Sequence, residues 1–313
     1  MKAEILKQGI CFNFVRRLSE DEVLSEACCI ESNFEGSAAL IFNPASFKVK
    51  DASWGIHHAP NPERRGEGKI PDIIGLSAYA DDREISSKKI PDYSLCVPYN
   101  LPPGGWIFPV EPKSAVLDAP DSENISPEWI KIRECINETL RGAYQSEFSL
   151  LEERGLNSLE NYEIMWNSPQ RENYCRPYIK SHMPYIVEWP EHTGAVQHYR
   201  KRDLYNKYLS FKITDEGDDL YTCFGSFHDS YHEMSISCKC SRYWVIRDVD
   251  ISLMRVPYEL CSSLDYDLEF NLEGQILKGM SKHELGKLIG GPKGCFHLLD
   301  IVAAMASAIN ELK

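Results

Sequence analysis

The sequence lacks long hydrophobic runs. Across its 313 residues, no apolar stretch approaches the roughly 20 residues that a membrane-spanning helix needs. The first six residues, Met-Lys-Ala-Glu-Ile-Leu, also lack the apolar segment and small-residue cleavage site of a signal peptide. We therefore expect a cytoplasmic protein without a membrane partner.

Basic residues are in the minority. The chain has 34 Lys and Arg against 47 Asp and Glu, which gives a formal net charge of −13. A nucleic-acid-binding protein needs a basic surface that neutralises phosphates. The runs Arg64-Arg65 and Arg200-Lys201-Arg202 are too short to form one. The charge therefore argues against a nucleic-acid partner, while the 43% hydrophobic content indicates a folded globular chain.

Cysteine, in contrast, is abundant and odd in number, with 11 residues. In a reducing compartment such cysteines are more often free thiols, metal ligands or nucleophiles than disulfides. Cys238 and Cys240 are one residue apart in a strand-like run, which places them on the same face of a strand. We interpret them as buried core thiols.

Two groups of strand-like runs indicate antiparallel meanders. Each run is rich in β-branched, aromatic or alternating apolar residues and is bounded by turn residues. The first group comprises residues 10–16, 23–30, 37–42 and 47–56, and the second comprises residues 207–213, 220–227, 234–240 and 243–254. Between the groups, residues 57–126 are rich in proline and glycine and predict long loops with at most a short strand or helix, of the kind that cover a pocket.

Helical periodicity follows each meander. Apolar residues recur from Pro127 to Leu151, with Ser126 as the predicted N-cap and Gly142 as a point where the helix can break. A short helix is predicted at residues 159–166, before a proline-rich linker. Near the C-terminus, residues 281–289 and the segment after Gly294 are predicted to be helical.

These patterns predict an α+β fold of two related halves, each an antiparallel strand meander followed by helices. A constant offset superposes the two meanders without a gap, so that Phe14 falls on Phe211 and Asp51 on Asp248. This match indicates either a divergent tandem repeat or a chance likeness between two meanders. The predicted domains are residues 1–190, with the first meander, the proline-rich loops and the long helix, and residues 191–313, with the second meander and its helices.

The segment from Gly290 to Asp300 places a thiol, an imidazole and a carboxylate within six residues. Cys295 follows a glycine-rich turn and is expected at the N-terminus of the last helix. There, free N–H groups, the helix dipole and the nearby Lys293 would lower its pKa toward thiolate formation at neutral pH. The alternative is a buried structural cysteine, with His297 only satisfying the helix start.

Two signatures carry a resemblance to a known family. The first is Phe227-His228-Asp229-Ser230, followed by His232-Glu233-Met234, Val245-Ile246-Arg247-Asp248, Met254, Pro257-Tyr258 and Cys261. The second is Gly294-Cys295-Phe296-His297-Leu298. On these residues the C-terminal half, from about Tyr208 to Ile309, resembles a bacterial family of unknown function that carries the number 2889.

The resemblance implies an α+β bacterial domain to which no activity is assigned. It marks Cys295, His297, His232 and Cys261 as positions that match the family pattern. Phe296 departs from that pattern, which usually has threonine at this position. The resemblance therefore identifies positions and supplies no mechanism.

One hypothesis is an enzyme that acts on a small molecule. Cys295 would be the nucleophile or acid, and His297 or His232 the general base. Asp229 or Asp300 would orient the histidine. The proline-rich loops would cover a largely apolar pocket for an aromatic or acyl substrate, with the aromatic side chains of Trp54, Trp106 and Trp166.

A second hypothesis is a metal site. Two cysteines and two histidines form a ligand set that zinc accepts tetrahedrally, namely Cys261, Cys295, His232 and His297. Their spacing is longer than that of a zinc finger. A third hypothesis is a binding or scaffold protein without catalysis, either stabilised by zinc or free of metal. The sequence leaves the reaction, the cofactor and the oligomeric state open.

Overall fold

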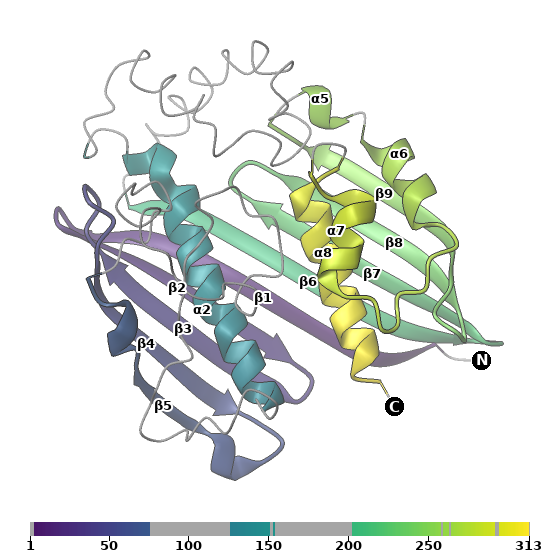
Figure 1. Cartoon of the computed structure of the whole chain (residues 1–313), viewed down its shortest axis with the longest axis horizontal. Helices are drawn as coiled ribbons and strands as arrows, with labels where there is room; N and C mark the ends of the chain where they lie inside the picture. The colour runs from purple at the N-terminus through teal and green to yellow at the C-terminus, as the bar shows by residue number, and fades with distance from the viewer. Residues whose placement is uncertain are drawn as a thin grey trace.

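The computed structural model describes residues 3–75, 126–150, 153, 202–257, 259–262, 264–291 and 294–312. In this part of the chain, nine strands form one antiparallel sheet in the order β5-β4-β3-β2-β1-β6-β7-β8-β9 (Figure 1). The strands that precede the long helix form one side of the sheet, and those that follow it form the other.

The strand bounds confirm the predicted strand runs. The N-terminal strands are β1 (Glu4–Ser19), β2 (Glu22–Glu31), β3 (Phe34–Phe42), β4 (Val49–His58) and the short β5 (Gly66–Lys69). The C-terminal strands are β6 (Asp203–Gly217), β7 (Leu220–Asp229), β8 (Glu233–Ser241) and β9 (Ile246–Arg255). Cys238 and Cys240 are fully buried in β8, as predicted.

The prediction of a balanced α+β fold with two helix-bearing halves is wrong. The two longest strands, β1 and β6, pair with each other antiparallel from Glu4 opposite Asp215 to Arg16 opposite Asp203. This pairing makes the two meanders one continuous sheet, and strand residues predominate over helical ones. The local alternation that identified each strand contains no information about which distant strand pairs with it.

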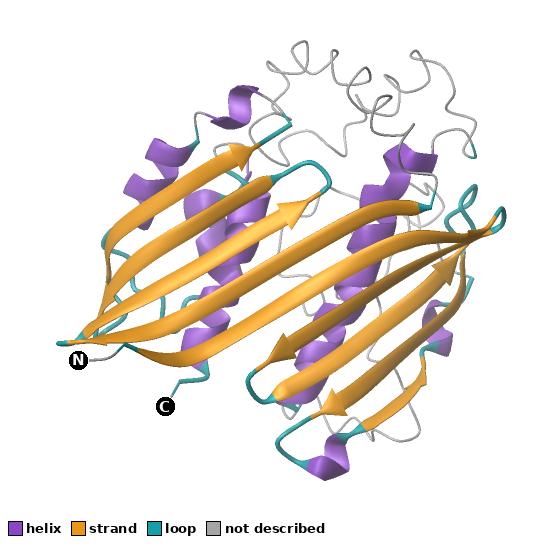
Figure 2. Ribbon diagram, turned by 180° about the vertical axis from the view of Figure 1, so that it is seen from behind, coloured by secondary structure: helices purple, strands orange, loops and turns teal. Residues whose placement is uncertain are grey.

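The described helices all lie on one face of the sheet, as Figure 2 shows from behind. Helix α2 (Pro127–Gln145) crosses β1 to β4, and α8 (Phe296–Asn310) crosses β6 to β8. Helix α6 (Asp265–Leu272) packs on β9, and α7 (Lys282–Ile289) packs on α8. A single turn, α5 (Glu259–Ser262), and the 3-10 turns η1 (Pro62–Arg64), η2 (Pro71–Ile73) and η4 (Ser146–Leu150) complete the set.

Two clusters of buried apolar side chains hold these helices to the sheet. One lies under α2 and includes Phe34, Phe42 and Leu140, and the other lies under α8 and includes Phe227 and Val302. Trp54 is 6% exposed and packs edge-on against Trp129 in the first cluster, so it is a core residue. Trp106 and Trp166 lie outside the described residues, as does the helix predicted at 159–166.

Two helices begin where the sequence predicted, although only Ser126 was predicted as an N-cap. The Ser126 hydroxyl accepts a hydrogen bond from the Trp129 N–H at 3.3 Å, and Ser281 forms a reciprocal capping box with Glu284. Helix α2 runs unbroken through Gly142. An added Cβ at Gly142 would overlap the Asn13 side chain of β1, so this glycine permits close contact between helix and sheet.

The gapless superposition of the two meanders is incorrect by one residue over the first three strands, whereas in the fourth it aligns buried Ala52 and Trp54 with buried Val249 and Ile251. Val15 is buried beneath the helices, so its neighbour Phe14 faces the opposite side of the sheet. Phe211, which the superposition aligned with Phe14, instead packs into the helix-covered core. A shift of one residue turns every side chain of a strand to the other face. The tandem repeat stays a prediction.

The face opposite the helices carries several apolar side chains. Ile10, Ile30, Tyr208 and Phe224 are each between 37% and 38% exposed there. No helix in the described part of the chain is both long and apolar enough to cross a lipid bilayer.

A first prediction concerns Gly225, where α8 approaches β7. An added Cβ would overlap Ile301 and lie 3.3 Å from the Ser210 carbonyl oxygen. We expect Gly225→Ala to lower the free energy of unfolding by about 1–3 kcal/mol through overpacking. Gly66→Ala is the control, because a Cβ added at Gly66 would lie 4.0 Å from the nearest atom, which belongs to the Trp54 ring. Urea denaturation would measure both, and an equal loss in both variants would contradict the packing argument.

Candidate functional site

The turn between β7 and β8 is built around Asp229. Its side chain is fully buried, and its Oδ1 atom accepts hydrogen bonds from the backbone N–H groups of Tyr231 at 2.7 Å and His232 at 2.6 Å. Its Oδ2 atom accepts from the Tyr205 hydroxyl at 3.2 Å. A carboxylate bonded to its own backbone two and three residues on is a local device for fixing a turn.

Arg255 secures this turn from the neighbouring strand β9. Its guanidinium donates to the carbonyl oxygens of Ser230 and Asp229, each at 2.8 Å, and to that of His232 at 3.2 Å. The backbone of the turn is therefore held by two groups, because Asp229 accepts from its N–H groups and Arg255 donates to its carbonyl oxygens. A side chain that projects from this turn has a defined position.

The turn brings His232 against His297 from the first turn of α8. The His232 Nδ1 atom lies 3.0 Å from Asp229 Oδ1, and the centroids of the two imidazole rings are 3.9 Å apart. One carboxylate oxygen of Asp229 and one ring nitrogen from each histidine all lie within 4.8 Å of one another. Phe227 packs against the outer side of His297, with ring centroids 4.7 Å apart.

The electrostatics of the cluster favour a carboxylate and a neutral imidazole. Burial alone would raise the pKa of Asp229, but the charge and hydrogen bond of His232, with His297 adding to them, hold it well below its usual value. Burial and the neighbouring His232 charge lower the pKa of His297 to about 3. His297 is therefore neutral at pH 7, with a ring nitrogen lone pair free of a proton.

Cys295 is the N-cap of α8, as predicted, but its predicted activation is wrong. The N–H groups of Leu298 and His297 do stabilise the thiolate. Burial outweighs them, and it raises the pKa of Cys295 to about 11. The sequence pattern identified the helix start correctly and contained no information about how deeply the sulfur is buried. Lys293 lies outside the described residues.

The structure brings together three of the predicted site residues, Asp229, His232 and His297. In the described part of the chain, neither Cys261 nor Cys295 belongs to a group of potential metal ligands that includes these histidines. Cys261 lies in α5, half-buried against the C-terminal core. Asp300, the alternative orienting residue, pairs instead with Arg141 at 2.6 Å and Lys282 at 2.5 Å.

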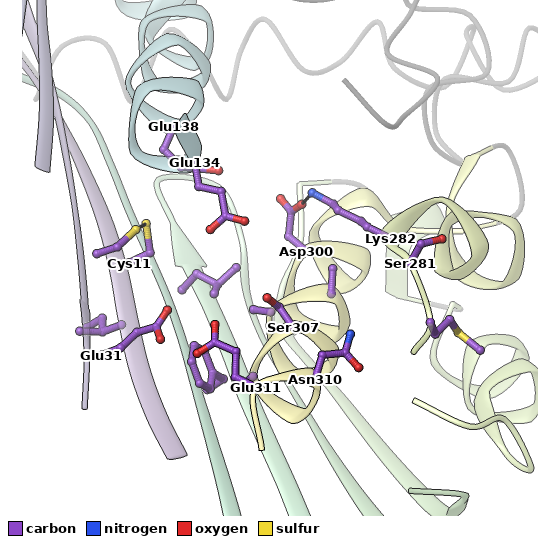
Figure 3. A pocket seen from close by; sticks show the side chains of 18 of the residues that line it. Cys11, Glu31, Glu134, Glu138, Ser281, Lys282, Asp300, Ser307, Asn310 and Glu311 are labelled. Carbon is purple, nitrogen blue, oxygen red and sulfur yellow. Dashed lines mark hydrogen bonds and ion pairs between the residues drawn. The ribbon is translucent and has the colours of Figure 1, made fainter. Parts of the chain in front are cut away.

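A cavity of about 370 Å³ lies between α2 and α8, above the central strands β1 and β6 (Figure 3). Its size is within the range of small-molecule pockets. The carboxylate of Glu134 extends into it from α2, and enclosure by the cavity raises the pKa of this group to about 7. The described lining of the cavity does not include Asp229, His232 or His297, so the cavity is separate from the histidine cluster.

Buried ion pairs beside the cavity connect α2 to α8 and to the sheet. Besides Arg141 and Lys282, Asp300 has Lys207 at 4.0 Å. Lys207 pairs with Glu138 at 2.5 Å, and Arg141 also reaches Glu138 at 2.9 Å. We call these five residues the Asp300 cluster. The contacts of the Asp300 cluster join α2 to α8.

Sequence reasoning missed most of these residues, although one signal was present. In β6 the helix-facing residues include Tyr205, Lys207, Leu209 and Ile213, which are buried, and Phe211, which is partly buried. A lysine on an otherwise apolar face of a strand indicates a buried partner, because an unpaired buried charge is costly. The same pattern marks Lys7 and Asn13 in β1.

Comparison with known proteins confirms the family resemblance. Residues 212–310 match the model of a family described as "Protein of unknown function (DUF2889)". This stretch contains Asp229, His232, Cys261, Cys295 and His297. Searches of the curated proteins and of the solved structures gave no match.

A second prediction tests the Asp300 cluster. Asp300→Asn removes the charge that faces three cations, so we expect it to lower the free energy of unfolding by about 3–5 kcal/mol. Asp248→Asn is the control. Asp248 pairs with Lys239 at 3.0 Å, but its side chain is 59% exposed, and such pairs contribute about 0–1 kcal/mol. Similar losses in both variants, measured by urea denaturation, would refute a stabilising role for the cluster.

A third prediction concerns pH. Burial opposes ionisation of Asp300, but Arg141, Lys282 and Lys207 hold its pKa below the usual value. A depressed pKa in the folded state stabilises the protein above the unfolded-state pKa of about 3.9, and this stabilisation is lost as the pH falls toward the folded-state value. We expect the free energy of unfolding to fall more steeply below pH 4 in the wild type than in Asp300→Asn. Parallel curves would contradict the assignment.

Proposed function

We propose that this protein binds a divalent transition-metal ion, zinc in the first instance, through Asp229, His232 and His297. The observation that carries the proposal is the convergence of one carboxylate and two imidazoles, with ligand atoms within 4.8 Å of one another. Zinc binds nitrogen and carboxylate oxygen at about 2.0–2.2 Å, so a small rotation of these side chains is enough to reach one ion.

The protonation states of the three groups are those that metal binding requires. The centroids of the two imidazole rings lie 3.9 Å apart, so the two rings cannot both be positively charged imidazolium without strong repulsion. Metal binding requires neutral imidazole and ionised carboxylate. His297 and Asp229 are already in these states at neutral pH.

Asp229 also fixes the geometry of His232. Two ligand atoms of one tetrahedral ion lie roughly 3–3.5 Å apart when each is about 2.0–2.2 Å from the metal. His232 Nδ1 and Asp229 Oδ1 are 3.0 Å apart, so they lie as two neighbouring ligands of one ion would. The backbone N–H groups of Tyr231 and His232 hold Oδ1 in this position, as hydrogen bonds hold ligating carboxylates in metal sites.

Three protein ligands favour a catalytic role over a purely structural one. Structural zinc sites have four protein ligands, whereas catalytic sites have three and leave a position for water or substrate. The His232 side chain is 14% exposed, so solvent reaches one side of the cluster. A metal-bound water or a polarised substrate oxygen is the chemistry that such a site supplies.

We therefore propose a metal-dependent enzyme that acts on a small molecule. Aromatic rings surround the histidines, including Phe227 and Tyr231, and they favour an aromatic or acyl group in that molecule. A thiol nucleophile at Cys295 is less well supported, because burial raises the pKa of this thiol to about 11.

A fourth prediction is that protein purified without chelator contains close to one zinc ion per chain. We expect His232→Ala and His297→Ala to lose most of it, since each removes one of three ligands. His283→Ala is the matched control, because His283 is exposed on α7. Elemental analysis by mass spectrometry gives the metal content, and circular dichroism shows whether each variant is folded.

Cys295→Ser separates this site from the four-ligand set of two cysteines and two histidines. We expect Cys295→Ser to retain zinc. Loss of zinc in this variant, or a wild-type protein without metal that takes up none on incubation with zinc, would overturn the proposal. If cobalt replaces zinc, its visible spectrum should change when azide is added, because an open position accepts the anion.

A further inference from the structure

Cys11 and Cys29 are direct cross-strand partners in the pairing of β1 with β2. Directly opposed residues of an antiparallel pair have Cα atoms about 4.5 or 5.5 Å apart, and their side chains are on the same face. Both separations lie within the range of about 4.4–6.8 Å that a disulfide spans. The backbone register alone therefore allows a bond between these two cysteines.

The two cysteine side chains also point toward each other. Cys11 Sγ lies 2.6 Å from Cys29 Sγ, so the sulfurs need almost no movement to bond. The C-terminal part of the sheet provides a comparison, because Cys223 and Cys238 are also direct cross-strand partners. There, the near contact of Cys223 is with Cys240, diagonally placed, at a sulfur–sulfur distance of 3.9 Å.

The two cysteine groups also differ in access. Cys11 and Cys29 line the cavity between α2 and α8, beside Glu138 and Lys207. Cys223, Cys238 and Cys240 are each 0% exposed in the C-terminal core. A small reagent can therefore reach the first pair through the cavity, whereas the second group has no exposed surface in the described structure.

We propose that Cys11 and Cys29 form a reversible disulfide in the wall of this cavity, with a small disulfide as the oxidant. One cysteine sulfur, as the thiolate, attacks the small disulfide. A mixed disulfide forms between that cysteine and one half of the reagent, and the other half leaves as a small thiol. The partner sulfur then displaces the second small thiol. Two protein S–H bonds and one small S–S bond are thus exchanged for one protein S–S bond and two small thiols.

The electrostatics indicate a switch with slow exchange and not a fast nucleophile. The mutual hydrogen bond and burial raise the pKa of Cys11 well above its usual value. The hydrogen bond with Cys11 lowers the pKa of Cys29, but its contact with Cys135 and burial outweigh this effect and raise it above the usual value. The thiolate is the attacking species, so the rate should increase with pH across the neutral range.

A fifth prediction tests this pair with 2-hydroxyethyl disulfide as the probe. The folded wild-type protein is incubated with the probe, alkylated and digested with trypsin, which cleaves after Lys7, Arg16, Arg17 and Lys48. We expect peptide 8–16 to be linked to peptide 18–48, with the mass of two hydrogen atoms lost. Dithiothreitol should restore both peptides.

Peptide 18–48 also contains Cys28, which serves as the internal control. Cys28 adjoins Cys29 in the strand, so its side chain faces the opposite side of the sheet. The link should persist in Cys28→Ser and disappear in Cys11→Ser and Cys29→Ser. Cys223, Cys238 and Cys240 should remain fully alkylatable after the protein is unfolded.

Three results would overturn the inference. They are a folded wild-type protein that forms no link, a link that is lost in Cys28→Ser, and a link that forms only after unfolding with denaturant. None of these results depends on whether the histidine cluster binds metal, because Cys11 and Cys29 lie outside the Asp229 turn.

Discussion

The antiparallel pairing of β1 with β6 is the constraint on which the rest of this structure depends. It joins a strand from the first half of the chain to one from the second half along most of their length, so two meanders that could each have formed a separate sheet form one. A single sheet has only two faces, and the described helices share one of them. Helices α2 and α8 therefore lie beside each other, each above its own hydrophobic core.

The space between α2 and α8 is the consequence of that arrangement. Neither helix covers the central strands fully, and the strands place the buried cations Lys7 and Lys207 beside the gap. Burial of these polar groups is tolerated because each cation has acidic partners from the helices or strands beside it. The same gap is the cavity onto which Cys11 and Cys29 open. The Asp300 cluster and the thiol pair are thus two results of one topological feature.

Local features of the fold were predictable from the sequence, and long-range ones were not. Alternating apolar residues identified eight of the nine strands, and Ser126 and Ser281 marked helix starts. The pairing of β1 with β6 joins segments some 200 residues apart, and the alternation of apolar residues within a strand does not predict its distant partner. For the site, the three-residue spacing of Asp229 and His232 made their contact predictable. The approach of His297 depends on how α8 packs on β7, and the high pKa of Cys295 depends on burial.

The central claim is that Asp229, His232 and His297 hold one metal ion. The most direct test is a crystal of the zinc-incubated protein measured at wavelengths on either side of the zinc absorption edge. The account predicts one anomalous peak within about 2.0–2.2 Å of a ring nitrogen from each histidine and of an Asp229 oxygen. No peak at the histidine pair, or a peak bound by Cys261 and Cys295, would contradict it.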